Sequence, residues 1–113
     1  LNDYLFAQNR AKSLFRDGGS MRMIRSKLLH KGISNPIIER VICEIVDEWK
    51  DPDLKAAIRL SERKRIGPFR ETETREVFRK RDLGVLGRAG FSFEIARKIV
   101  DASDFKDLDQ SDG

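Results

Sequence analysis

A short helix–turn–helix segment occurs twice in this chain, and it constrains the fold more than any other feature. The two copies are residues 28–34 (LLHKGIS) and residues 86–92 (LGRAGFS). A glycine just past a helix end can adopt the left-handed conformation that closes a C-terminus, and a serine two residues later is a favoured N-cap. Aligned on their glycines, the copies match Leu28 with Leu86, Ile33 with Phe91, Ile37 with Ile95 and Val41 with Ile99. The pattern therefore predicts one helical unit that is repeated.

Apolar residues at helical spacing predict an all-α chain with about six helices. Leu28, Val41 and Ile45 lie on the inner stripes and are expected core residues. Trp49 ends such a stripe, so we interpret it as core rather than as a stacking platform for a base. Cys43, among apolar neighbours, is expected to be a buried thiol. The expected helices cover about residues 3–16, 21–31, 35–48, 52–65, 81–88 and 93–101.

These helices predict an elongated fold of tandem three-helix repeats that resemble helix-turn-helix units. We expect one repeat over residues 1–49 and a second over residues 50–101, with a polar insertion near residues 70–79. The insertion is compatible with an extra charged turn and with a mobile loop, and both stay open. Residues 102–113 are rich in aspartate and poor in apolar residues, which predicts a disordered tail. Since the chain begins with Leu1, we expect it to be part of a longer protein.

Positive charge is concentrated in the body of the chain. Residues 1–98 hold 22 Lys/Arg and 14 Asp/Glu, whereas residues 99–113 hold one Lys and five Asp. A basic body indicates a polyanion or an acidic protein surface as partner. The alternative, a basic face that is only solvated, stays open. The candidate binding residues are Arg16, Arg22, Arg25, Lys27, Lys31, Arg79, Lys80, Arg81 and Arg88.

The sequence lacks the usual patterns of catalysis and metal binding. Its glycine pair at residues 18–19 lacks the spacing and the lysine–hydroxyl ending of a phosphate-binding loop. One histidine and one cysteine cannot build the usual zinc sites. We therefore expect a binding protein without catalytic residues, cofactor or metal. No apolar run reaches the length of a membrane span, so no membrane partner is expected, and the single cysteine fits a reducing cytoplasm.

Several short motifs, in this order, resemble the RecX family of bacterial regulatory proteins. The first unit carries Asn2-Asp3-x-x-Phe6-Ala7, Gly18, Ile24-Arg25, Leu28 and Lys31-Gly32-Ile33-Ser34, and the second carries Leu83, Leu86, Arg88, Gly90-Phe91-Ser92-Phe93 and Ile95. The resemblance covers roughly residues 1–101. Members of this family are tandem three-helix repeats, normally three, so the chain looks like the second and third repeats. Gly84 and Gly87 depart from the pattern, because a stronger helix former is common there.

The resemblance implies a non-catalytic modulator of the RecA recombinase in the bacterial cytoplasm. Family members bind RecA and its filament on single-stranded DNA, and they generally restrain its ATPase and strand-exchange activities. Direct contact with single-stranded or double-stranded DNA is a further expectation, and we expect the chain to be a monomer. Two other functions stay open. One is a general nucleic-acid-binding helical module, and the other is an adaptor for a different acidic protein.

Overall fold

The computed structural model describes residues 2–109, while residues 1 and 110–113 lie outside the described part. Within that part the chain is helical and has no strand. None of its helices is both long and apolar enough to cross a membrane. The helices are α1 (Asp3–Arg16), α2 (Met21–His30), α3 (Asn35–Glu48), α4 (Pro52–Lys64), the 3-10 turn η1 (Gly67–Phe69), α5 (Thr72–Arg75), α6 (Arg79–Arg88), α7 (Phe93–Val100) and α8 (Lys106–Asp109).

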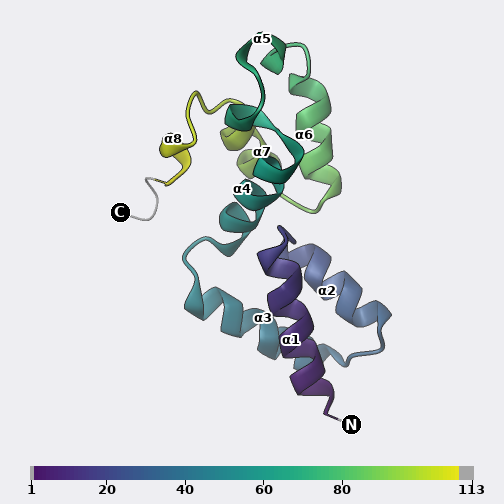
Figure 1. The fold of residues 1–113 in the computed structure, drawn as a ribbon. Helices are drawn as coiled ribbons and strands as arrows, with labels where there is room; N and C mark the ends of the chain where they lie inside the picture. The colour runs from purple at the N-terminus through teal and green to yellow at the C-terminus, as the bar shows by residue number, and fades with distance from the viewer. Residues whose placement is uncertain (1, 110–113) are drawn as a thin grey trace.

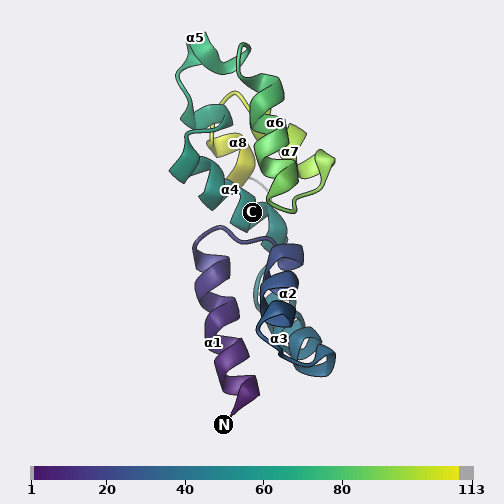
Figure 2. The same cartoon turned by 90° about the vertical axis from the view of Figure 1, so that its right-hand side faces the viewer.

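Two helical units lie end to end. Helices α1, α2 and α3 pack together in the first, and α4, α6 and α7 form the second, with α5 at the far end from the N-terminus (Figures 1 and 2). The molecule measures 51 × 30 × 20 Å. The expectation of an elongated, all-α fold of tandem three-helix units is therefore confirmed.

The repeated glycine turn has the same hydrogen bonds in both units. Gly32 (φ +85°) and Gly90 (φ +98°) adopt the left-handed conformation just after α2 and α6. The residue after each glycine, Ile33 or Phe91, is buried, and its N–H donates to the carbonyl of Leu28 (3.1 Å) or of Leu86 (3.2 Å). These bonds form a Schellman motif, whose apolar contact seals the helix end. The repeat seen in the sequence is thus a repeat of backbone geometry.

The expected serine caps differ between the copies. The Ser92 hydroxyl accepts from the N–H of Ile95 at 3.2 Å, as expected of an N-cap. Ser34 holds the N-cap position of α3 with extended backbone but makes no side-chain capping bond. Pro36 follows in the first turn of α3, where a missing N–H costs little because that group has no helical partner.

The expected core residues are buried, but Cys43 is not. Leu28, Val41 and Ile45 are all inaccessible to solvent or nearly so. Trp49 is half-buried, and its ring lies 5.5 Å from that of Phe15, so it packs as interpreted. The expectation of a buried Cys43 is wrong. This thiol lies on the exposed side of α3, because the apolar face of that helix does not extend to its position.

Leu28→Ala is expected to lower the free energy of unfolding by about 2–5 kcal/mol, because it removes a fully buried side chain and leaves a cavity. Urea denaturation of the variant measures the loss. The matched control is Leu29→Ala on the same helix, where the side chain is 58% exposed and the change should stay within about 0.5 kcal/mol. Equal effects of the two substitutions would contradict the packing of α2.

The polar insertion is a folded segment that contacts the second unit. The Arg75 guanidinium donates hydrogen bonds to the carbonyl of Val100, the last residue of α7, and to the carbonyl of Ala102, just beyond it. It thereby provides a partner for carbonyls at the end of this helix. Arg70 makes a bidentate ion pair with the buried Asp82 of α6, with N–O distances of 2.9 and 2.8 Å. Helix α6 also begins at Arg79, two residues earlier than the apolar pattern predicts.

The acidic tail differs from the expected disorder over residues 102–109. Helix α8 carries Leu108, which is only 1% exposed, and Phe105 stacks against Phe69 with ring centroids 6.5 Å apart. Two apolar side chains therefore anchor the tail to the fold. The low overall apolar content of the tail gave no sign of these two contacts. Residues 110–113 of the expected tail lie outside the described residues.

Leu108→Ala is expected to cost about 2 kcal/mol of stability, at the lower end for a buried leucine because the end of the chain can relax around the gap. Thermal unfolding followed by circular dichroism tests this. Lys106→Ala in the same short helix is the control, because Lys106 is exposed. An unchanged melting temperature for Leu108→Ala would show that the tail contributes nothing to the fold.

A hydrogen-bond network ties α1 to α3 in the first unit. The Tyr4 hydroxyl donates to the Glu44 carboxylate, and the Gln8 amide donates to the same carboxylate at 3.1 Å. The Tyr4 bond lowers the pKa of Glu44 and raises the pKa of Tyr4 from their ordinary values. The Arg40 guanidinium lies 3.9 Å from the centre of the Tyr4 ring.

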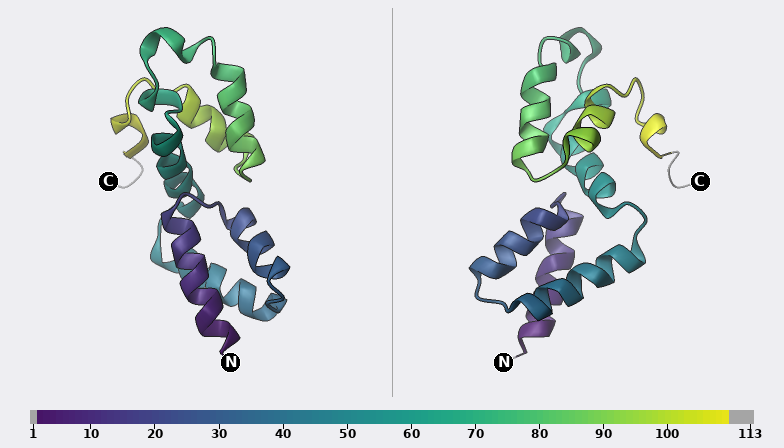
Figure 3. Two further views of the ribbon diagram at one scale, coloured as in Figure 1. Left: turned by 45° about the vertical axis from the view of Figure 1, so that its right-hand side comes forward. Right: turned by 180° about the vertical axis from the view of Figure 1, so that it is seen from behind.

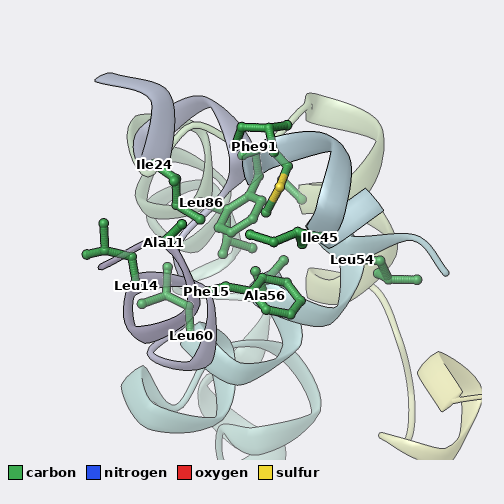
Figure 4. Packing of buried hydrophobic residues seen from close by; sticks show 14 of the residues in the cluster. Ala11, Leu14, Phe15, Ile24, Ile45, Leu54, Ala56, Leu60, Leu86 and Phe91 are labelled. Atoms are coloured by element: carbon green, nitrogen blue, oxygen red, sulfur yellow. The ribbon is translucent and has the colours of Figure 1, made fainter. Parts of the chain in front are cut away.

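The two units share one continuous core and several polar contacts. Figure 4 shows buried side chains of both units within one cluster. The Ser20 hydroxyl, which caps α2, donates to the carbonyl of Ala89 at 2.9 Å, and Asp53 accepts from the N–H of Met21 at 2.8 Å. The Arg59 guanidinium lies over the rings of Phe15 and Trp49. These contacts hold the second unit at a defined orientation on the first.

Candidate partner-binding site: a basic cleft between the two units

A cleft of about 600 Å³ opens where the two units meet, a size typical of ligand-binding sites. The helices that line it come together at this joint, with the end of α6 close to α2 (Figure 3). Its apolar lining is Leu14, Met23, Leu60, Val85 and Ala89, and its charged lining is Arg10, Asp17, Lys27, Arg63, Lys64 and Arg88. The glycine turn at residues 18–19 forms part of its wall.

Helical spacing explains why the cleft has an aliphatic floor and a basic rim. Residues three or four apart lie on the same face of a helix, so a cation and an aliphatic residue one turn apart reach the same cleft. Four of the cations follow this rule. The pairs are Arg10 with Leu14 on α1, Lys27 with Met23 on α2, Lys64 with Leu60 on α4, and Arg88 with Val85 on α6.

The cleft brings together five cations that form no ion pair in the described part of the chain. Three arginines outside the cleft form close ion pairs: Arg25 with Glu39 at 2.9 Å, Arg70 with Asp82 at 2.8 Å and Arg79 with Asp101 at 2.7 Å. By contrast, residues 2–109 provide no ion pair for Arg10, Lys27, Arg63, Lys64 or Arg88. Asp17 is the one acidic residue in the lining. Such an excess of positive charge attracts an anionic partner.

Gly84 has no side chain and so leaves space for the Arg88 guanidinium at the cleft. A Cβ at residue 84 would lie 3.1 Å from Nη1 of Arg88, so the guanidinium lies back over this glycine. At Gly87, three residues further along α6, an added Cβ would meet nothing within 4 Å. Gly84 weakens the helix, but it makes room for a charged group of the cleft.

Some of the residues predicted from the sequence lie together here. Lys27 and Arg88 line the cleft. Lys31 lines an adjoining hollow of about 290 Å³, which shares Arg10 and Lys27 with it. Arg81 lines neither hollow: it lies seven residues before Arg88 on the same side of α6, and its guanidinium lies 5.6 Å from the centre of the Phe78 ring.

The other predicted residues lie elsewhere. Arg25 is engaged with Glu39, and Arg79 with Asp101, where the hydrogen bonds lower the pKa of the Asp101 carboxyl and raise that of Arg79. Arg22, on the flank of α2 opposite Lys27, has its Cβ 3.6 Å from the position of a Cβ added at Gly90. The remaining two, Arg16 and Lys80, are exposed and do not line the cleft.

The sequence-based prediction did not include three lining residues: Arg10, Arg63 and Lys64. Arg10 is separated from Lys27 by a glycine turn, and the other two end a helix of the second unit. One signal in the sequence indicates two of them: Arg10 and Lys64 each have an aliphatic residue one helical turn away. That signal gains meaning only when the four helices are placed around one joint.

Comparison with known proteins identifies the family. A family model described as "RecX, second three-helix domain" matches residues 2–42, which comprise α1, α2 and the first part of α3. A "Regulatory protein RecX" of Myxococcus xanthus (strain DK1622) is 43% identical over 104 residues, which cover 91% of this chain and 54% of the relative. The chain belongs to the RecX family. A "Regulatory protein RecX" of Agrobacterium fabrum (strain C58 / ATCC 33970) is 30% identical over 100 residues, covering 88% of this chain and 51% of the relative.

The chain therefore spans about half the length of these RecX relatives. The residues that match the family model lie in the first helical unit of the fold. No solved structure matches the chain. Both relatives carry the name of a regulatory protein.

Proposed function

We propose that this chain is a non-catalytic regulator that binds the RecA recombinase on single-stranded DNA and lowers its ATPase and strand-exchange activities. It would act in the bacterial cytoplasm as a monomer, with one repeat in residues 1–49 and a second in residues 50–101. RecA enters this proposal through the family, whose two matched relatives are regulatory proteins.

The observation that carries the proposal is the set of unpaired cations in the inter-unit cleft. Five basic side chains from four helices surround one concave site, and Asp17 is the single acid in its lining. A RecA filament on DNA offers phosphate groups and acidic protein surface, and both attract such a site in a salt-dependent way. A regulator of this kind needs only to bind the filament and to block its activities, and a rigid helical protein can do both without catalytic groups.

The proposal is tested by RecA-dependent ATP hydrolysis on single-stranded DNA, titrated with this chain. We expect the rate to fall as the chain is added, and the effect to weaken at higher salt concentration. An unchanged rate, in the presence of filament that binds the chain, would contradict the inhibitory role. No binding to the filament at low salt would reject the RecA partner altogether.

A general nucleic-acid-binding module is the second candidate, and the basic cleft also favours it. Titration of the chain against labelled single-stranded DNA, with and without RecA, distinguishes a RecA regulator from a general module. A regulator of RecA binds the filament more tightly than bare DNA, whereas a general module binds bare DNA equally well. Binding to RecA without DNA, unaffected by salt, would instead favour an adaptor role.

A further inference from the structure

We propose that the inter-unit cleft docks an acidic, amphipathic helical segment of a protein partner. This inference rests on the proposed binding role of the cleft and names the chemistry of its occupant. Aliphatic side chains of the segment would lie on the floor formed by Leu14, Met23, Leu60 and Val85. Its carboxylates would face the basic rim.

The floor distinguishes a peptide from a nucleic acid strand. Proteins that bind single strands stack the bases on aromatic side chains in a basic groove. The residues that line this cleft include no aromatic side chain, and its apolar members are all aliphatic or thioether groups. Asp17 also lies in the lining, where it can accept a hydrogen bond from a free N–H in the first turn of a bound helix. The lining therefore fits leucine-like anchors better than bases.

The spacing of the rim fits a helix as the occupant. Each of four cations lies one turn from a floor residue, and an amphipathic helix presents the same relation between its acidic and apolar residues. Apolar anchors of a bound helix recur at three- and four-residue intervals along a groove. Met23 suits such a surface, because its side chain is flexible and polarizable and adapts to the shape of an anchor.

Charge complementarity commits the site to an acidic segment rather than a basic one. The five rim cations are unpaired within residues 2–109, so a carboxylate that approaches them does not have to displace an existing partner. Arg63 and Lys64 are exposed at the end of α4, and Lys27 is exposed on α2. The expected attraction is therefore long-ranged and sensitive to salt.

The test is fluorescence anisotropy with a labelled synthetic helical peptide that carries leucines on one face and glutamates on the other. The full chain is titrated into this peptide, into a peptide of the same composition with the leucines distributed around the helix, and into labelled oligo-dT. We expect the amphipathic peptide to bind at least about tenfold more tightly than the scrambled peptide, because only the former seats its anchors on the floor.

Point variants separate the floor from the rim. Met23→Gln keeps the length of the side chain but makes the floor polar, and it should weaken peptide binding about tenfold. Lys27→Met keeps an unbranched chain but removes one rim charge, and it should weaken binding and reduce the salt dependence. Arg22→Met is the control on the same helix, since Arg22 lies outside the cleft and should leave binding unchanged.

Two glycine variants provide a test that does not weaken the fold. Gly84→Ala and Gly87→Ala both raise the helix propensity of α6. Only Gly84→Ala places a methyl group against the Arg88 guanidinium, so only this variant should change the affinity for the peptide. Equal affinities of the two variants would remove Arg88 from the proposed site.

Other outcomes overturn the proposal. If the scrambled peptide binds as tightly as the amphipathic one, the cleft attracts charge alone and has no apolar subsite. If oligo-dT displaces the peptide and binds more tightly, the cleft is a nucleic-acid site. These measurements contain no RecA, so they can fail while the effect on RecA's ATPase stands, and the reverse also holds.

Discussion

Replacing Arg70 with leucine is expected to lower the free energy of unfolding by about 3–5 kcal/mol, because the buried Asp82 carboxylate would lose its countercharge. The side chains of Asp82 and Arg70 are only 3% and 19% exposed. The Arg70 guanidinium donates to both carboxylate oxygens and lies 4.5 Å from the centre of the Phe78 ring. Denaturation in urea measures the loss.

The double variant Arg70→Leu, Asp82→Leu separates the ion pair from packing. It removes both charges, so it should recover most of the lost free energy of unfolding. Replacement of a buried ion pair by apolar residues often leaves a protein as stable as before. Arg25→Leu is the control, because the Arg25–Glu39 pair is about half exposed and should contribute no more than about 1 kcal/mol. A double variant as unstable as Arg70→Leu alone would show that the arginine acts through packing.

Reversing two charges in the cleft, Lys27→Glu with Arg63→Glu, is expected to weaken binding to the RecA–DNA filament by at least about tenfold. Each reversal replaces an attraction with a repulsion at the proposed contact. Both side chains are exposed and unpaired within the described residues, so the fold should not change. Filament binding is measured by co-sedimentation at several salt concentrations, with circular dichroism as the check on folding.

The control for this prediction carries the same change in net charge outside the cleft. Arg22→Glu with Arg97→Glu alters two exposed arginines, on the opposite flank of α2 and on α7. This variant should bind nearly as well as the parent chain. An equal loss in both variants would mean that the filament responds to overall charge, and the cleft would then not be the site.

Local interactions could be predicted from the sequence because they involve residues close together in the chain. The glycines at positions 32 and 90 and the apolar residues that follow them specify both Schellman motifs, since each bond joins residues five apart. The apolar stripes identified Leu28, Val41 and Ile45 as core for the same reason, because helical periodicity places them on one face. The family resemblance rests on these same local motifs.

The tertiary structure alone decided which charges are free and where they gather. Arg10, Lys27, Arg63 and Arg88 lie far apart in the chain and meet only because α4 positions the second unit against the end of the first. In the same way, only folding pairs Arg79 with Asp101 and buries Leu108. Composition counts all cations alike, whereas each ion pair depends on side chains that packing brings together. The same packing places five of the unpaired cations around one cleft at the joint.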